Sequence, residues 1–200
     1  MKMRNLARGM CLCAVLLTAC TSVPPRFYQL QATTMPGQHQ QPGAVLLVEQ
    51  VTLPAGMDRP QLLLENTEGR PQLQEQDYWT ASLSRLLTQS VAGNLATQLG
   101  LSTVYAAPQL SLGRTDLSLQ LDVREFRLRH GQGASLAAAW RLVQPASHKV
   151  LLQGYFNQQQ PVTVPGNAAL VSAQQQLLDV LSRQIGAAMA AHPDYLHPAI

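Results

Sequence analysis

The sequence predicts one α+β domain, in which a mainly antiparallel sheet carries two long helices on one face. Residues 79–99 and 168–191 have the apolar spacing of amphipathic helices, and each follows a group of strand-like segments. The second group contains three long strand segments joined by short turns, which favours antiparallel pairing. Strands, a helix, strands and a helix are the order expected when two helices cover one face of such a sheet.

The first group of strands is short and rich in turns. Residues 26–30 predict a first strand that joins the domain, and residues 31–43 carry proline and glycine among polar residues, as loops do. Residues 44–53 are apolar and β-branched, so we expect a strand buried on much of both faces. After a turn with proline and glycine, residues 61–67 and 72–76 predict two more strands.

The helix predicted at residues 79–99 has its apolar residues at i, i+3 and i+4 spacing, which places them on one face. These residues are Leu83, Leu86, Leu87, Val91, Leu95 and Leu99. Gly100 follows as a C-terminal cap, because glycine readily adopts the left-handed conformation that ends many helices. Trp79 would open the helix, and we expect Trp79 and Trp140 to pack in the core rather than to line a lipid groove.

The second group of strands begins with an alternating pattern. Apolar residues occupy every second position from Leu117 to Val123, as in a half-buried strand. The apolar positions then shift to Phe126 and Leu128. Such a change of phase predicts a β-bulge near residues 124–125, because a bulge adds one residue to one strand of a pair.

The remaining elements follow from similar signals. Residues 130–133 contain two glycines and predict a hairpin turn, after which residues 136–142 form a returning strand. Residues 149–158 predict another strand. The second helix, residues 168–191, ends at a His-Pro pair, and we expect a loose tail over residues 193–200. Glutamine-rich stretches are interpreted as uncharged polar surface; they lie at residues 38–41, 158–160 and 174–176.

The start of the chain has the pattern of a secretory signal. Lys2, Arg4 and Arg8 precede an uncharged stretch, residues 10–19, which is too short to cross a bilayer. The sequence Leu17-Thr18-Ala19-Cys20 that ends it resembles the lipobox of bacterial lipoprotein precursors. The alternatives are a plain signal peptide with an incidental cysteine, or an inner-membrane anchor helix.

The lipobox resemblance implies that residues 1–19 are removed and that Cys20 becomes an acylated first residue. One acyl chain holds a protein only reversibly, so several chains on one residue give stable attachment. Thr21 follows the cysteine where an aspartate is the usual signal for inner-membrane retention, which points to the outer membrane and the periplasm. The mature chain would consist of a lipidated N-terminus with the first strand and polar loop (20–43), the main domain (44–192) and the tail.

Removal of the signal changes what the composition implies. The chain has 14 basic and 11 acidic residues, and three of the basic ones precede Cys20, so the mature net charge is 14 − 3 − 11 = 0. The basic isoelectric point of the precursor is therefore no sign of nucleic-acid binding. Cys11 and Cys13 also leave with the signal, and acylation uses the thiol of Cys20, so we expect no disulfide.

The sequence contains no recognisable catalytic or cofactor motif. The five histidines do not follow a metal-ligand spacing, and there is no nucleophile elbow, P-loop or dinucleotide-binding glycine pattern. The acidic residues are scattered. We therefore predict a non-enzymatic protein with no metal site and no cofactor; a periplasmic hydrolase is the alternative that a specific nucleophile would support.

With these motifs placed, the mature chain resembles the ABC-type transport auxiliary lipoproteins, the PqiC/YmbA family. The segments that carry the resemblance are the lipobox ending at Cys20, Phe27–Leu30, Val51–Pro54, Asp58–Leu62, Trp79 with Leu83, Asn94-Leu95, Leu121–Phe126, Trp140–Leu142 and Ala169–Ala173. The resemblance implies an outer-membrane lipoprotein that works with an MCE-domain periplasmic protein and inner-membrane transporter components in lipid transport. It would dock the periplasmic conduit to the outer membrane, and a homo-oligomeric ring is one form this docking could take.

Four residues of the matching segments are candidates for partner contact: Asp58, Arg59, Pro60 and Gln61. The competing interpretation is that they only form a turn, since the residue before a proline is held in extended geometry. A second function class is a stand-alone lipid-binding or envelope-assembly lipoprotein with an apolar groove between sheet and helices. Lipid that co-purifies with the domain would be its mark.

Overall fold

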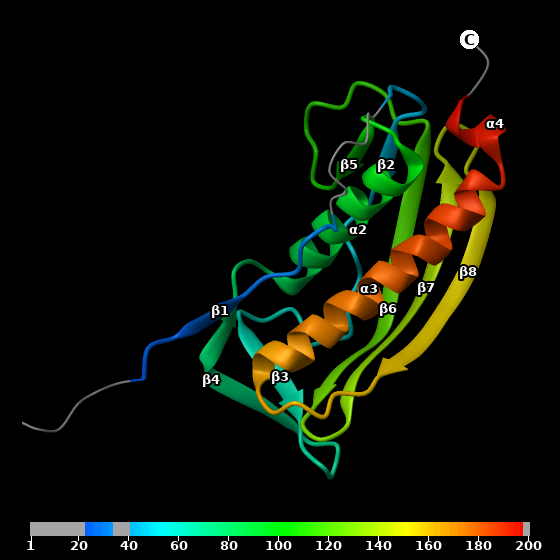
Figure 1. Ribbon diagram of the computed structural model, residues 1–200. Coiled ribbons are helices and arrows are strands. Elements are labelled where there is room, and N and C mark those ends of the chain that lie inside the picture. The colour runs from blue at the N-terminus through cyan, green and yellow to red at the C-terminus, as the bar shows by residue number, and fades with distance from the viewer. Residues whose placement is uncertain (1–22, 34–40, 198–200) are drawn as a thin grey trace, which may run out of the picture.

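The computed structural model describes residues 23–33 and 41–197 (Figure 1). The predicted signal peptide, Cys20, the first residues of the stretch 38–41 and the last three residues of the chain lie outside these ranges. Within them, the chain forms one mixed eight-stranded sheet with two long helices. The predicted α+β single-domain fold is confirmed.

Three long strands form the antiparallel part of the sheet: β6 (Leu117–Arg129), β7 (Gly133–Gln144) and β8 (Lys149–Gln160). β7 lies between the other two and pairs with both. The register of β6 against β7 shifts between Val123 and Glu125, which confirms the predicted bulge. The bulge lets apolar side chains before and after it face the same core, although their sequence positions differ in parity.

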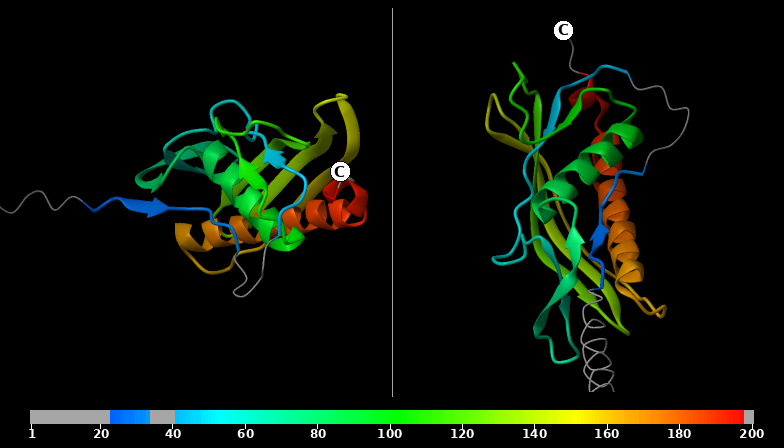
Figure 2. Two further views of the ribbon diagram at one scale, coloured as in Figure 1. Left: turned by 90° about the horizontal axis from the view of Figure 1, so that it is seen from above. Right: turned by 90° about the vertical axis from the view of Figure 1, so that its left-hand side faces the viewer.

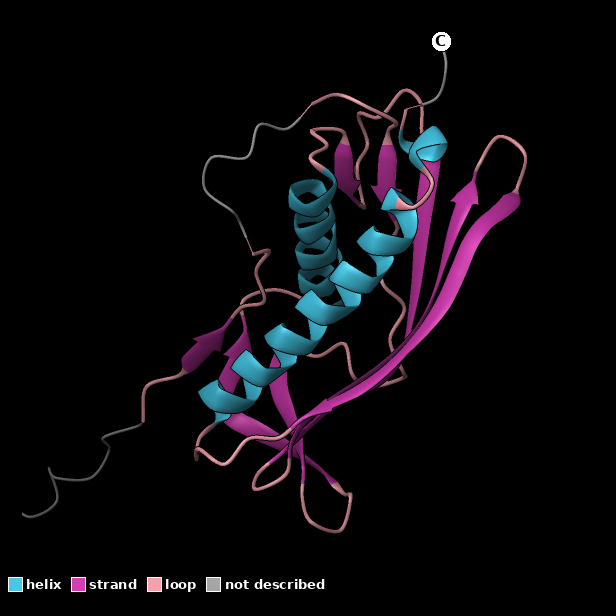
Figure 3. Ribbon diagram, turned by 45° about the vertical axis from the view of Figure 1, so that its right-hand side comes forward, coloured by secondary structure: helices cyan, strands magenta, loops and turns pink. Residues whose placement is uncertain are grey.

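Two helices lie on one face of the sheet (Figure 3), one over β6 to β8 and the other over the shorter strands of the sheet. They are α2 (Leu83–Leu99) and α3 (Asn167–Ala190). Gly100 has φ 64° and ends α2 in the predicted left-handed cap. The helices also contact each other, where the Asn94 amide of α2 donates to Asp179 of α3 at 3.0 Å.

The other edge of β6 is shared by two short parallel strands. β2 (Leu46–Val48) pairs with its first residues, and β3 (Gln61–Glu65) meets its last residue, Arg129. β3 in turn pairs with β4 (Pro71–Trp79) in antiparallel fashion, and β1 (Arg26–Tyr28) lies parallel to the end of β4. β5 (Val104–Ala106), which the sequence did not predict, closes the sheet beside β2.

The strand predicted over residues 44–53 is much shorter than expected. It stops at Val48 because the backbone then turns toward α2, where the Val51 N–H donates to the Thr88 hydroxyl at 3.0 Å. Pairing with β6 resumes at a single bridge, Thr52 to Asp122. Apolar composition alone did not reveal this interruption, because the side chain of Val51 is buried in either arrangement.

The start of the first long helix and the C-terminal tail also differ from prediction, and the strands predicted at 26–30, 61–67 and 72–76 are observed at Arg26–Tyr28, Gln61–Glu65 and Pro71–Trp79. Trp79 ends strand β4 instead of opening the helix, since its N–H donates to the Pro60 carbonyl at 2.7 Å; its predicted core position is confirmed. The start of the predicted loose tail is instead a short helix, α4 (Pro193–Leu196). Leu196 is buried, and its carbonyl accepts from the Ala44 N–H at 2.8 Å, so this part of the tail is fixed to the domain.

The core fills the space between the sheet and the helices. Leu119 and Leu142 from the sheet face Leu177 and Leu181 from α3, and all four are at most 2% exposed. Full burial of each such side chain contributes about 2 kcal/mol to folding. The lipid-binder interpretation expects an apolar groove between the sheet and the helices. In the structure, these buried side chains fill the space between the sheet and α3.

Trp140 packs in the core as predicted, and a glycine makes room for it. Gly154 lies opposite Trp140 on β8, and a Cβ at this position would come within 2.6 Å of the indole ring. Glycine inside a strand is otherwise unfavourable, so its presence here follows from the close approach of the ring.

Gln174 is an exception to the predicted polar surface. It lies on the buried face of α3, is 0% exposed, and neither its amide nitrogen nor its amide oxygen has a hydrogen-bond partner. The following Gln175 is half-buried and Gln176 is exposed. Of this stretch, only the last residue is placed as expected.

Candidate interaction surfaces

The four predicted partner-contact residues lie together where the chain enters β3, but they do different things. Asp58 reaches the start of α2, where its carboxylate accepts from the Ser84 N–H at 3.2 Å and from the Ser84 hydroxyl at 2.6 Å. The first N–H groups of a helix have no partner within it, and a carboxylate there is also favoured by the helix dipole. Ser82, at the N-cap, makes no capping bond itself. Asp58 therefore has a structural role.

The next residues leave more of their surface free. The Arg59 guanidinium donates to the Gly56 carbonyl at 2.5 Å, and Arg59 and Pro60 are both exposed. Gln61 begins β3 and pairs with Tyr78 of β4. Asp58 bonds to Ser84 rather than to its neighbour Arg59, so the side chain of Arg59 is the member of the group best placed to contact a partner.

The helices cover one face of the sheet and leave the other uncovered (Figure 2). A polar cleft of about 680 Å³ opens on the uncovered face. One wall is the segment Glu49–Thr52, which leads directly to residues 58–61. The floor and the other wall come from outward-facing residues of β6, β7 and β8: Gln120, Asp122, Arg124, Ala139, Arg141, Gln153 and Tyr155. Gln50 of this wall and Asp58 of the predicted contact segment both bond to the Ser84 hydroxyl, so the segment lies beside a surface that sequence reasoning did not single out.

The cleft holds paired charges rather than reactive ones. Glu49 accepts from the hydroxyl of Ser118 and from the Gln120 amide, at 3.3 Å in the second case. Arg141 donates to the other end of that amide at 3.0 Å. Fixed amide and guanidinium groups of this kind suit polar contacts with a protein partner, which usually combine hydrogen bonds with a few aromatic or arginine side chains.

Arg124 adds a cation to this surface. Its guanidinium carbon lies 5.9 Å from the centre of the Tyr155 ring, and its Nε lies 3.5 Å from the Asp122 carboxylate. Tyr155 is 52% exposed despite its size. An exposed tyrosine beside arginine is a typical feature of protein-protein contact sites.

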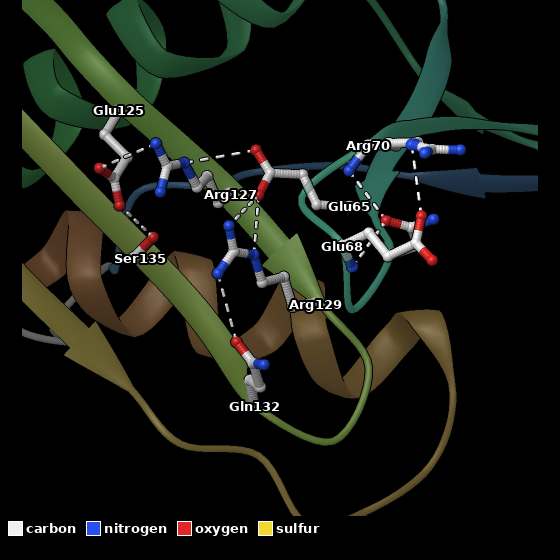
Figure 4. Close-up of polar contacts among 9 residues, drawn as sticks. Glu65, Glu68, Arg70, Glu125, Arg127, Arg129, Gln132 and Ser135 are labelled. Atoms are coloured by element: carbon white, nitrogen blue, oxygen red, sulfur yellow. Dashed lines mark hydrogen bonds and ion pairs between the residues drawn. The ribbon is translucent and has the colours of Figure 1, made fainter.

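A second polar group joins the two halves of the sheet (Figure 4). β3 and β6 share one backbone pair, Glu65 with Arg129, and the Glu65 carboxylate accepts from Arg129 at 2.7 Å and lies 3.3 Å from Arg127. Glu125 accepts from Ser135 of β7 at 2.6 Å. Since β3 and β6 share only one backbone pair, the contacts of Glu65 with Arg127 and Arg129 hold the β3–β4 hairpin to the long strands.

A third polar group fixes β1, the first described strand. Asp77 of β4 is 2% exposed and accepts 2.7 Å hydrogen bonds from the Arg26 guanidinium and the Tyr28 hydroxyl. The side chain of Asn167, the first residue of α3, also lies near this carboxylate and lowers its pKa. This group, which we call the Asp77 junction, therefore joins β1, β4 and α3.

The junction shifts the pKa values of its members. Burial raises the pKa of Asp77, but hydrogen bonds from Arg26, Tyr28 and Asn167 and the charge of Arg26 outweigh it, so the pKa lies below 3.8. Burial, followed by the hydrogen bond to Asp77, raises the pKa of Tyr28 to about 12. Asp77 lies two residues before the buried Trp79 on β4, so the two side chains point to the same face of the strand. This spacing is the feature of the sequence that could have indicated a buried acidic residue.

Residues 23–33 and 41–197 contain no group of three or more His, Cys, Asp or Glu side chains that could hold a metal ion. No helix in these ranges is long and apolar enough to cross a membrane.

The fold and its surfaces define a compact α+β domain with a helix-covered face and a polar open face. The chain belongs to the family described as the ABC-type transport auxiliary lipoprotein component, whose model matches residues 28–186. No curated protein matches the sequence.

Two solved structures share the fold, and a third is more distantly similar. A Xanthomonas campestris protein of the DUF330 family is 20% identical and superposes with a TM-score of 0.66 over 84% of this chain and 97% of its own. An uncharacterized protein is 18% identical with the same TM-score, over 84% and 99% of the two chains. A PelC from Paraburkholderia phytofirmans, crystallised as a dodecamer, is 16% identical with a TM-score of 0.41, over 75% and 93%.

Proposed function

We propose that this protein is a non-enzymatic lipoprotein of the outer membrane that faces the periplasm and docks the conduit of an MCE-type lipid transport system. The observation that carries the proposal is the family match over residues 28–186. The lipobox ending at Cys20 supplies the membrane anchor in this proposal. Inner-membrane transporter components would supply the energy, since the chain has no P-loop of its own.

In this proposal the MCE-domain protein binds the open sheet face. The helix face is committed to the core, whereas the open face presents Gln120, Arg141 and Tyr155 around the cleft. Arg59 stands on the segment that continues from the cleft wall. A polar surface of this kind favours a partner that binds and releases over one that is buried permanently, because permanent interfaces are more apolar.

The test is photo-crosslinking in native envelopes. A photoreactive residue at Gln153, exposed on the open face, should form an adduct with the MCE-domain protein, and one at Arg183, exposed on α3, should not. Adducts between copies of the chain would report a homo-oligomer. Cys20→Ser should remove the protein from outer-membrane fractions.

The possible outcomes separate the hypotheses. Equal adducts from both positions would contradict docking through the open face. Outer-membrane location without any MCE-domain adduct would favour a stand-alone envelope lipoprotein. Retention of the Cys20→Ser protein in the outer membrane would contradict lipid anchoring.

A further inference from the structure

One end of the domain gathers the first described residues and an uncharged loop. The chain enters at Val23, and the loop of residues 161–166 precedes α3 toward the same end, as Figure 1 and the right-hand view of Figure 2 show. The C-terminal end of the described chain and the loop of residues 107–116 lie at the opposite end. We call residues 23–27 together with 161–166 the anchor-proximal end.

The Asp77 junction holds the two segments of this end together. Arg26 and Tyr28, on either side of Phe27, bond to Asp77 from β1. The side chain of Asn167, at the start of α3 and immediately after the loop, lies near the same carboxylate and lowers its pKa. The two segments are therefore parts of one surface rather than independent flexible arms.

This surface exposes apolar side chains without an acidic residue among them. Val23 is 64% exposed, and Phe27 and Val164 are each 65% exposed. The only charged residue in the two segments is Arg26, whose side chain is 60% exposed. The charge of Arg26 is paired with Asp77, so the two segments present exposed apolar side chains without an unpaired negative charge, as suits the boundary between headgroups and acyl chains of a phospholipid bilayer.

The length of chain before this surface indicates what covers it. Cys20 is the third residue before Val23 and the sixth before Arg26. An extended chain covers at most about 3.5 Å per residue, so β1 begins within about 20 Å of the Cys20 sulfur. An anchor at Cys20 would thus keep this end beside the bilayer whatever path the intervening residues take.

We propose that the anchor-proximal end seats on the phospholipid surface, with Phe27 and Val164 at headgroup depth and the opposite end directed away from the membrane. The inference rests on the lipid anchor of the proposed function and adds a second, non-covalent contact to it. The orientation of the domain is then fixed by the domain itself, and the open sheet face stands along the membrane normal, accessible from the periplasm.

The test uses the absence of other thiols. Once Cys20 is acylated, the mature sequence contains no further cysteine, so Val164→Cys and Leu110→Cys each give one labelling site. Leu110 is fully exposed in the loop at the opposite end and serves as the matched control. Each lipidated full-length mature protein is labelled with an environment-sensitive dye and reconstituted into vesicles of phosphatidylethanolamine and phosphatidylglycerol carrying a headgroup quencher.

We expect the dye at residue 164 to shift to the blue and to lose most of its emission to the quencher, and the dye at residue 110 to keep its emission. Equal emission at both positions in protein that floats with the vesicles would overturn the seated orientation and leave the anchor intact. Failure of the lipidated protein to float would instead overturn the anchor, and the orientation with it. Phe27→Cys repeats the measurement from the other segment.

Discussion

We expect the buried side chain of Gln174 to lower the stability of the fold. Its amide is removed from water but gains no hydrogen bond in return, and such a group costs about 1–3 kcal/mol. We expect Gln174→Leu to raise the free energy of unfolding by about 1 kcal/mol or more, measured by urea denaturation. Leucine is close in size and would join the apolar stripe.

Gln175→Leu is the matched control for this change. The Gln175 oxygen accepts from the Gln31 N–H at 2.9 Å, and its nitrogen donates to Asp179 at 2.8 Å. This substitution should therefore lower stability. A loss of stability in Gln174→Leu as well would show that Gln174 has a partner, such as a buried water, that its replacement leaves without a hydrogen bond.

The Asp77 junction predicts a particular response to acid. Because the pKa of Asp77 is lower in the folded protein than its ordinary value of 3.8, its contribution to stability is complete above about pH 4. The contribution is lost as the pH falls through the lowered pKa. We expect the difference in unfolding free energy between the native protein and Asp77→Asn to be constant at neutral pH and to shrink below pH 3.8.

Denaturant titrations at several pH values measure this difference. The Asp179→Asn protein is a suitable control, since Asp179 also accepts side-chain hydrogen bonds but lies between the two helices, away from β1. A difference for Asp77→Asn that stays the same down to pH 2 would show that the carboxylate charge is not what holds the junction.

At the scale of elements, α2 depends on a residue outside itself. Asp58 accepts from two groups of Ser84, and loss of a capping side chain typically costs about 1 kcal/mol. We expect Asp58→Ala to lose about this much stability. Arg59→Ala should stay within about 0.5 kcal/mol of the native protein, because its side chain is exposed and bonds only to a nearby carbonyl.

The same pair of variants separates fold from contact. Urea denaturation gives the stabilities, and crosslinking to the partner gives the binding. Arg59→Ala should be stable yet crosslink less. Unchanged crosslinking in this variant would limit the segment to its structural role, and an Asp58→Ala protein of native stability would contradict the capping interpretation.

Long elements were predictable from sequence, and short ones were not. β6, β7, α2 and α3 each repeat their period several times, so apolar spacing identifies them and even locates the bulge after Val123. β5 has three residues, too few for a period, and β2 ends where the hydroxyl of Thr88 competes for the backbone. Gln174 has the spacing of the core stripe, four residues after Leu170 and four before Leu178, but its polarity obscured this.

At the scale of the whole molecule, the sequence predicted which segment takes part in the candidate site, but it did not predict the surface that this segment adjoins. The segment 58–61 could be selected from its motif, but the cleft beside it is assembled from β6, β7 and β8 by pairing between distant residues. The parallel placement of β2 and β3 along β6 could not be derived either. It depends on single contacts such as Glu65 with Arg129, which leave no periodic trace in the sequence.

The Asp77 junction also decides how the domain responds to a pull. A force between an acylated Cys20 and a bound partner would enter the domain through β1, which pairs with β4 over three residues. The long sheet and the helices would carry little of this load until β1 gives way. Release of residues 23–33 would then lengthen the tether by at most about 39 Å, at about 3.5 Å per residue, while strands β6 to β8 stay folded. The protein would act as an extensible link, and the first contacts to break would be those of Arg26 and Tyr28 with the buried Asp77 carboxylate.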